Sequence, residues 1–236
     1  MVSGATVAIV GVGGLGAPVG WALARAGVRK LVLVDDDLVD RSNLHRQILF
    51  GEDDVGRHKL DASVAALRTL APALELEAIR ARLHPGNVGV LAGADVIVEC
   101  SDRYAVKFLV ADAARLLGKP VVHGAAIRWL GTAMATSAQG APCYRCLFED
   151  VPSGAQSSCD VSGVVGPVCG IVGALQADLA LGVLAGRGRF GVVTTVDGLR
   201  GTLRSATISR RSGCPLCGDA PTIDRIEPSR YTFEPC

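Results

Sequence analysis

Short apolar runs alternate with segments of helical periodicity over the first 130 residues of the chain. The runs that predict buried parallel strands are 6–10, 31–34, 96–98 and the run that begins at 121. The segments that predict helices between them are 16–27, 59–70 and 108–117. This alternation predicts an α/β fold built on a doubly wound, Rossmann-like, mainly parallel sheet.

The pattern changes after residue 131, where a loop-rich stretch begins. A helix is expected over 164–184, and strands are expected over 192–196 and 202–208. Because no repeat or linker interrupts the chain, we expect a single domain, 1–236. The change of pattern divides it into a first half at 1–130, a second half at 131–218 and a tail at 219–236.

The segment 163–186 is apolar enough and long enough to cross a bilayer. Gln176 and Asp178 fall in its middle, and Pro167 with several glycines weakens it as a lipid-facing helix. We therefore expect a buried core helix and no membrane partner.

The charge balance and the cysteine content indicate which kinds of partner and which cellular compartment to expect. The 24 Lys and Arg nearly balance the 23 Asp and Glu, so no global field favours nucleic acid. Eight cysteines in 236 residues are typical of metal binding or chemistry in a reducing compartment. With no cleavable signal visible at the N-terminus, we expect a cytoplasmic protein.

A glycine loop follows the first expected strand and opens a helix. Its members are Gly11, Gly13, Gly14 and Gly16. Small residues there let a phosphate approach backbone N–H groups at the helix N-terminus. Asp35 ends the second strand, where a carboxylate can accept from ribose hydroxyls. The loop by itself fits NAD, FAD or ATP, and a glycine-rich tight turn is the non-functional alternative.

Polar and cationic residues follow the second strand. Arg46 and Lys59 indicate a triphosphate whose charge must be neutralised while a bond to phosphorus breaks, and Asn43 and Gln47 offer orienting hydrogen bonds. The alternative for the acidic run 35–40 is a solvated, charged loop.

Two Cys-x-x-Cys pairs lie in the second half of the chain. Four thiolates in two such pairs are typical of a closed, tetrahedral, structural zinc site, formed here by Cys143, Cys146, Cys214 and Cys217. Disulfides and a thioredoxin-like redox pair are the alternatives. Buried packing is expected for Cys100 and Cys169, and an incidental role for the terminal Cys236.

Together these motifs resemble the ThiF/MoeB/HesA family, relatives of the ubiquitin-activating enzymes, from about Val7 to Gly218. The shared motifs are Gly-x-Gly-Gly-x-Gly at 11–16, Asp-x-Asp at 35–37, Ser-Asn-Leu-x-Arg-Gln at 42–47, Val-Gly-x-x-Lys at 55–59, Gly-Ala-Ala-Ile-Arg at 124–128, Pro-Cys-Tyr-Arg-Cys at 142–146, Gly-Val-Val-Gly-Pro at 163–167 and Gly-Cys-Pro-Leu-Cys at 213–217.

The resemblance implies an adenylyltransferase. MgATP and the C-terminal glycine carboxylate of a small ubiquitin-like sulfur-carrier protein, ending in Gly-Gly, would give an acyl-adenylate and pyrophosphate. The implied nucleotide-binding residues are the four glycines, Asp35 and Asp37 beside the ribose, Asn43, Arg46, Gln47 and Lys59 at the phosphates, and Asp102 at Mg²⁺. A helix N-cap is the alternative for Asp102. The half 1–130 would bind the nucleotide, and the zinc-clipped, zinc-bearing C-terminal half 131–218 would bind the carrier. The enzyme would be a homodimer with a separate sulfur-donor protein.

The chain departs from the family pattern in two places. Arg103 follows Asp102 where the family usually has Asn, and the N-terminal segment whose arginine reaches the partner subunit's ATP is expected to be missing. Cys159 aligns with a cysteine that takes up the acyl group in some members and is dispensable in others. It is therefore either a nucleophile or a spare loop thiol.

Three other functions stay open. They are adenylation of a short peptide in a natural-product pathway, a non-catalytic partner subunit, and an NAD- or FAD-dependent oxidoreductase. Arg46, Lys59 and the zinc clip speak against the oxidoreductase, because a dinucleotide pyrophosphate is already held by the glycine loop.

Overall fold

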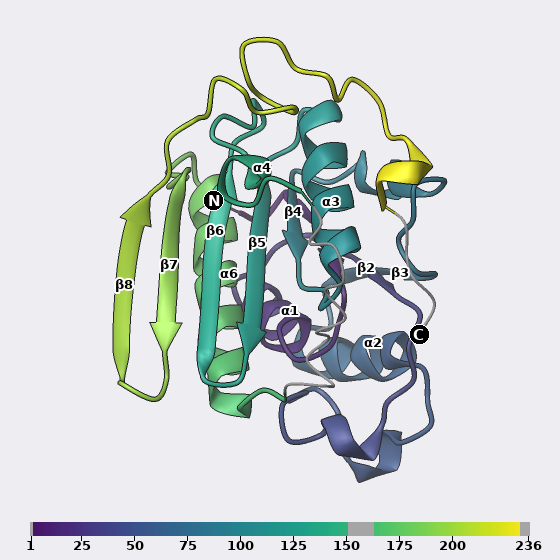
Figure 1. The fold of residues 1–236 in the computed structure, drawn as a ribbon. Coiled ribbons are helices and arrows are strands. Elements are labelled where there is room, and N and C mark those ends of the chain that lie inside the picture. The colour runs from purple at the N-terminus through teal and green to yellow at the C-terminus, as the bar shows by residue number, and fades with distance from the viewer. Residues whose placement is uncertain (1, 151–162, 232–236) are drawn as a thin grey trace.

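A single eight-stranded sheet runs through the molecule, in the order β3-β2-β1-β4-β5-β6-β7-β8 (Figure 1). The computed structural model describes residues 2–150 and 163–231. Strands β1 to β5 pair in parallel, and β6, β7 and β8 extend the sheet in antiparallel fashion. The strands are β1 Thr6–Val10, β2 Lys30–Asp35, β3 Glu75–Arg80, β4 Val96–Glu99, β5 Val121–Ile127, β6 Leu130–Thr136, β7 Val192–Asp197 and β8 Thr202–Thr207. The expected doubly wound, mainly parallel sheet is confirmed.

Helices cover both faces of this sheet. They are α1 Gly16–Arg25, α2 Lys59–Leu70, α3 Tyr104–Leu116, α4 Tyr144–Leu147 and α6 Gly166–Leu184. Helices α1, α2 and α6 pack on one face, where Leu23, Leu67 and Val172 bury against the strands. Helices α3 and α4 cover the other face, where Phe108 and Tyr144 are buried. Each face of the sheet therefore has its own apolar core.

Two strands differ from the sequence-based prediction, because β3 and β6 were not expected. Strand β3, Glu-Leu-Glu-Ala-Ile-Arg, lies at the edge of the sheet and is largely exposed, so it lacks the continuous apolar run of the central strands. Strand β6, Leu-Gly-Thr-Ala-Met-Ala-Thr, is built from small residues with weak strand preference. Its pairing with β5 and β7 on either side forms it instead.

Several element boundaries differ from the expected ones, and the largest difference is at α3, which begins at Tyr104 rather than at residue 108. Helix α1 ends at Arg25 rather than at residue 27, because Gly27 takes a positive φ of 79° just beyond the C-cap Ala26. Helix α6 begins at Gly166, with Pro167 in its first turn, rather than at residue 164. Strand β8 ends at Thr207 rather than at residue 208.

Helix α6 is the core helix that the sequence predicts. It is also the one helix in 2–150 and 163–231 that is long and apolar enough to cross a membrane. It packs against α1, β5 and β6, and Val172, Gln176 and Ala180 are fully buried. The amide of Gln176 donates to the Glu99 carbonyl at 2.8 Å, so a polar residue in the middle of the helix is used inside the protein.

Two glycines of α6 test how tightly this helix packs. A Cβ at Gly173 would lie 2.4 Å from Pro18 Cγ and 2.9 Å from the Leu15 carbonyl oxygen, whereas a Cβ at Gly170 meets nothing within 4 Å. We expect Gly173→Ala to lower the free energy of unfolding by about 1–3 kcal/mol through overpacking. Gly170→Ala should raise it by roughly 0.5–1 kcal/mol through helix propensity. Urea denaturation measures both, and equal effects would contradict the close contact of α1 and α6.

Candidate functional site

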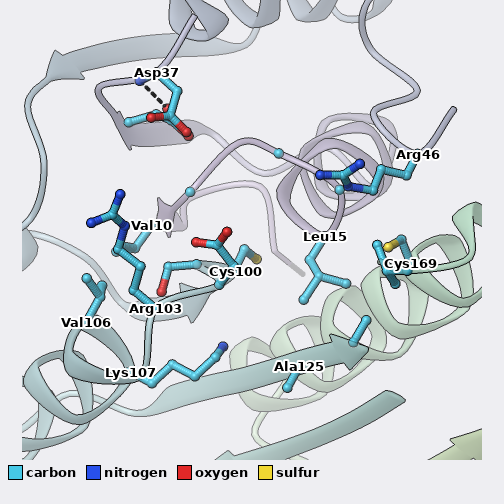
Figure 2. Close-up of a pocket in the computed structure, with 18 of the residues that line it drawn as sticks. Val10, Leu15, Asp37, Arg46, Cys100, Arg103, Val106, Lys107, Ala125 and Cys169 are labelled. Atoms are coloured by element: carbon cyan, nitrogen blue, oxygen red, sulfur yellow. Dashed lines mark hydrogen bonds between the residues drawn. The ribbon is translucent and has the colours of Figure 1, made fainter. Parts of the chain in front are cut away.

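A pocket of about 440 Å³ opens at the carboxyl ends of β1, β2 and β4 (Figure 2). Nearly all the nucleotide-site residues expected from the sequence line it: Gly11, Gly13, Gly14, Asp35, Asp37, Asn43, Arg46, Gln47, Lys59 and Asp102. Gly16 lies behind the lining. The pocket continues past Ala125 and Thr132 on β5 and β6. The glycine loop and Asp102, which the sequence separates by about 90 residues, thus meet at one edge of the sheet, where ligands of doubly wound folds bind.

The backbone of the glycine loop requires glycine at two positions, Gly11 and Gly16. Gly11 has φ of 88°, and a Cβ on Gly16 would lie 1.9 Å from the Gly11 carbonyl oxygen. A Cβ on Gly14 would contact Arg46 and the Cys169 sulfur at 3.3–3.5 Å. No side chain caps the N-terminus of α1, whose backbone N–H groups favour an anion. The loop therefore offers a phosphate both room and donors.

Asp35 is fixed by the glycine loop and by its own strand end. Its carboxylate accepts the Val12 N–H at 2.8 Å and the Asp37 N–H at 2.9 Å. Burial raises the pKa of Asp35, while the nearby Lys59 ammonium and the two backbone donors oppose that shift. Each oxygen keeps a further lone pair, so the carboxylate can still accept from a ligand hydroxyl.

Lys59 is the first residue of α2 and is only 7% exposed. Its ammonium lies 2.7 Å from Asp37 Oδ2. The lysine expected at the phosphates is therefore held at the pocket by an acidic partner. Because Asp37 is itself exposed, the pair can rearrange toward a bound anion without opening the core.

Arg46 and Gln47 reach the pocket from the segment that follows β2. Figure 2 shows Arg46 on one side of the pocket and Arg103 on the other. Gln47 is 3% exposed, and its Oε1 accepts no hydrogen bond within the described part of the chain. A buried acceptor without a partner costs about 1–3 kcal/mol, so this amide indicates a missing donor such as a ligand or water.

The turn after β4 carries Asp102 and Arg103. Asp102 is exposed, lines the pocket and has no hydrogen-bond or ion-pair partner among residues 2–150 and 163–231. It does not cap α3, because Arg103 occupies the N-cap position and no side chain caps this helix. The N-cap alternative for Asp102 is therefore wrong. Cys100, the first residue of this turn, is buried, and burial raises the pKa of its thiol.

Four cysteines from two distant segments meet on the α3 side of the sheet. All four are buried, and their sulfurs lie within 4.8 Å of one another. The sulfurs of Cys143 and Cys214 are 3.5 Å apart, and those of Cys146 and Cys217 are 3.4 Å apart. A disulfide needs about 2.05 Å, whereas tetrahedral zinc with Zn–S of about 2.3 Å separates its sulfurs by about 3.8 Å. The cluster fits a metal and not the disulfide alternative.

An ion pair that the sequence analysis missed anchors this cluster to α3. Arg145, between Cys143 and Cys146, binds Asp112 with two hydrogen bonds of 2.8 and 2.9 Å. The Tyr231 hydroxyl donates to the same carboxylate at 2.6 Å. Arg145 and Asp112 are 2% and 0% exposed. The sequence did hold one signal for this buried pair: the charged Asp112 stands between Ala111 and Ala113 in an otherwise apolar part of the helix.

The remaining cysteines divide into two groups. Cys100 and Cys169 are buried, as expected, and both also line the pocket. Cys159 and Cys236 lie outside the described residues, so the predicted roles of Cys159 and Cys236 stay predictions.

Comparisons with known proteins agree with this geometry. The model of the ThiF family matches residues 2–216. The chain belongs to the ThiF family. It is 40% identical over 229 residues to the SAMP-activating enzyme E1 of Haloferax volcanii, covering 95% of this chain and 84% of the relative. It is 41% identical over 227 residues to the sulfur carrier protein adenylyltransferase of Thermus thermophilus, covering 92% and 84%. This ThiF-family chain is an adenylyltransferase.

Two further comparisons define how far the likeness extends. The mouse adenylyltransferase and sulfurtransferase MOCS3 is 40% identical over 228 residues, which span 94% of this chain and 50% of MOCS3. The crystal structure of E. coli MccB with ATP superposes with a TM-score of 0.81 at 20% identity, over 92% of this chain and 68% of MccB. At that identity the superposition shows a common fold.

The buried ion pair of Arg145 and Asp112 is expected to contribute strongly to the stability of this ThiF-family fold. We expect Arg145→Lys to lower the free energy of unfolding by about 2–4 kcal/mol, because lysine cannot make the bidentate contact inside the protein. The matched control is Arg189→Lys, whose exposed pair with Asp178 should matter by less than about 0.5 kcal/mol. Urea denaturation compares the two. Similar losses at both positions would contradict a special role for the buried pair.

Proposed function

We propose that this chain adenylates the C-terminal glycine of a small ubiquitin-like sulfur-carrier protein. One observation carries the proposal. The relatives at 40 and 41% identity over more than nine-tenths of the chain are named as an activating enzyme for SAMP and an adenylyltransferase for a sulfur carrier protein. The pocket supports it, because residues suited to a nucleoside triphosphate meet there.

ATP fits the pocket by the chemistry of its walls. We assign the triphosphate to the glycine loop, Arg46 and Lys59, because backbone N–H groups and these two cations line one pocket. Asp35 then lies where a ribose hydroxyl would donate, with Asp37 beside it. The unpartnered Oε1 of Gln47 and the amide of Asn43 complete the contacts.

Mg²⁺ fits the exposed carboxylate of Asp102, since this ion prefers carboxylate oxygens and phosphate ligands. When bound, the ion would offset negative charge on the phosphates. Asp102 would hold it, while Arg46 and Lys59, which line the same pocket, would share the charge of the polyphosphate.

The proposed reaction needs positioning more than acid–base catalysis. A glycine carboxylate is already ionised near neutral pH, so no general base has to remove a proton. Its oxygen attacks the α-phosphorus of ATP, a new C–O–P bond forms, and the bond to the pyrophosphate oxygen breaks. Pyrophosphate leaves with the electron pair. The cations of the pocket lower the barrier by neutralising the charge that collects on the leaving group.

The extension of the pocket along β5 and β6 suits a slender acyl tail. Four small residues line it beside the larger Ile127 and Leu130: Ala125, Ala126, Gly131 and Thr132. A Cβ on Gly131 would lie 2.3 Å from Val172 Cγ2, so helix α6 packs directly against this wall. A C-terminal Gly-Gly has no side chains to accommodate there, which fits the expected carrier.

The expected homodimer, the separate sulfur donor, the cytoplasmic location and an acyl-accepting role of Cys159 belong to this proposal as well. The family resemblance supports them, and the absence of disulfides among the described cysteines agrees with a reducing compartment. We also propose, on the same family resemblance, that residues 131–218 bind the carrier.

We further propose that Cys143, Cys146, Cys214 and Cys217 bind one structural Zn²⁺. Metal analysis of the purified protein should find about one zinc per chain. Cys214→Ser should lose the metal and destabilise the fold by more than about 4 kcal/mol, because the ion joins two distant segments. Cys100→Ala is the control and should keep its zinc, since Cys100 lies outside the cluster. Full metal content in Cys214→Ser would contradict the site.

ATP–pyrophosphate exchange tests the proposed reaction. With carriers ending in Gly-Gly we expect exchange that depends on the carrier. Asp102→Ala should slow it by on the order of a hundredfold, as loss of a charge-stabilising group does. Asp53→Ala removes an exposed carboxylate away from the pocket and should keep the wild-type rate.

Each alternative function predicts a different result in the same assay. Exchange without a carrier, or with a short peptide alone, would favour peptide adenylation. No exchange with any carrier would indicate a non-catalytic subunit. Bound nicotinamide or flavin in the purified protein would indicate an oxidoreductase.

A further inference from the structure

A buried ion pair lies beneath the turn that carries Asp102. Lys107 Nζ is 2.7 Å from Glu99 Oε2, and the two side chains are 5% and 0% exposed. Glu99 is the last residue of β4, and Lys107 lies in the first turns of α3. The chain between the two partners is therefore the turn 100–103 and the first three residues of α3.

The second oxygen of Glu99 holds the backbone of this turn. Oε1 accepts the Ser101 N–H at 2.8 Å and also the Ser101 hydroxyl in a short hydrogen bond. Ser101 immediately precedes Asp102 in the chain. One carboxylate thus joins the ammonium of α3 to the residue next to the proposed Mg²⁺ ligand.

Lys107 extends the contact to a third element. Its ammonium also donates to the Gly124 carbonyl oxygen on β5, and its side chain lines the pocket (Figure 2). Gly124 leaves room for this arrangement, because a Cβ there would lie 2.2 Å from the Gln176 carboxamide. The Gln176 amide in turn donates to the Glu99 carbonyl oxygen at 2.8 Å. Elements β4, α3, β5 and α6 all meet at this pair.

Stability alone does not require charges here. Removing two ions from water costs several kcal/mol each, and well-packed apolar residues of similar volume are often as stable as a buried ion pair. What an apolar pair cannot do is accept the Ser101 amide and hydroxyl. The Asp102 side chain has no partner within the described ranges, so its direction depends on how the turn before it is held.

We propose that Glu99 and Lys107 are a positioning pair that fixes the Ser101–Asp102 turn, so that the Asp102 carboxylate faces the metal-bearing phosphates. The assignment rests on the proposed function, since it takes Asp102 as the Mg²⁺ ligand. Glu99 touches no ligand and acts only through the turn. Residues placed behind a metal ligand commonly change metal affinity about 10- to 100-fold when they are replaced.

Calorimetric ATP binding by the full chain, with Mg²⁺ and with EDTA, tests the pair. In Lys107→Met we expect the affinity gain that Mg²⁺ provides to fall about 10- to 100-fold, with little change in EDTA. Lys107→Arg should keep most of the gain, because a guanidinium can still pair with Glu99. An equal loss with and without Mg²⁺ would show that Lys107 acts on the nucleotide directly and would overturn the proposal.

A second variant separates positioning from simple instability. Glu99→Met with Lys107→Met leaves no unpaired buried charge, so its free energy of unfolding should lie closer to wild type than that of Lys107→Met alone. The Mg²⁺-linked gain should stay low in the double variant. If the double variant recovered both the stability and the Mg²⁺-linked gain in ATP affinity, the pair would serve only as a structural contact. That result would overturn the positioning role.

Hydrogen exchange reports the turn without any ligand. The Ser101 amide, which donates to Glu99, should exchange faster in both variants than in wild type, while the Cys100 amide, which donates to the Val10 carbonyl, and the amides of β1 stay protected. Unchanged exchange in the turn would refute the positioning role even if ATP binds normally. A wild-type protein that binds no ATP would instead defeat the proposed function, and the exchange data would still decide what the pair does.

Discussion

The site depends on the position of β1 between β2 and β4. Both neighbours pair with β1 in parallel, and the chain leaves β1 through the glycine loop at the edge where β2 and β4 also end. Gly11 therefore packs against the backbone of Cys100 and Ser101, where an added Cβ would lie 3.1–3.2 Å away. The order of the strands therefore makes neighbours of three features that lie far apart in the sequence. They are the glycine loop, the carboxylate of Asp35 and the turn that carries Asp102.

Two buried ion pairs connect this edge of the sheet to the rest of the fold. Glu99 and Lys107 join β4 to α3 and β5, and Asp112 joins the other half of α3 to Arg145 and Tyr231. Helix α3 is thus held at one end by the pocket and at the other by the segment with the four cysteines. We interpret the cysteine cluster as a clip that keeps the C-terminal portion against α3, away from the pocket itself.

Sequence patterns predicted the features whose chemistry is local. The glycine spacing, Asp35 at a strand end and the two Cys-x-x-Cys pairs each carry their meaning within a few residues. Edge strand β3 and the small-residue strand β6 lacked such a signal, since tertiary pairing forms them. The buried pairs were missed for a related reason: a lysine at 107 or an aspartate at 112 reads as a polar helix face until its partner is placed opposite.

The central claim is that the pocket joins AMP to the end of a carrier protein. Intact-mass spectrometry of a carrier ending in Gly-Gly, incubated with the enzyme and MgATP, tests this most directly. The account predicts a carrier heavier by one adenylyl group, which reverts when pyrophosphate is added. A carrier that stays unmodified while the enzyme hydrolyses or merely retains ATP would contradict it.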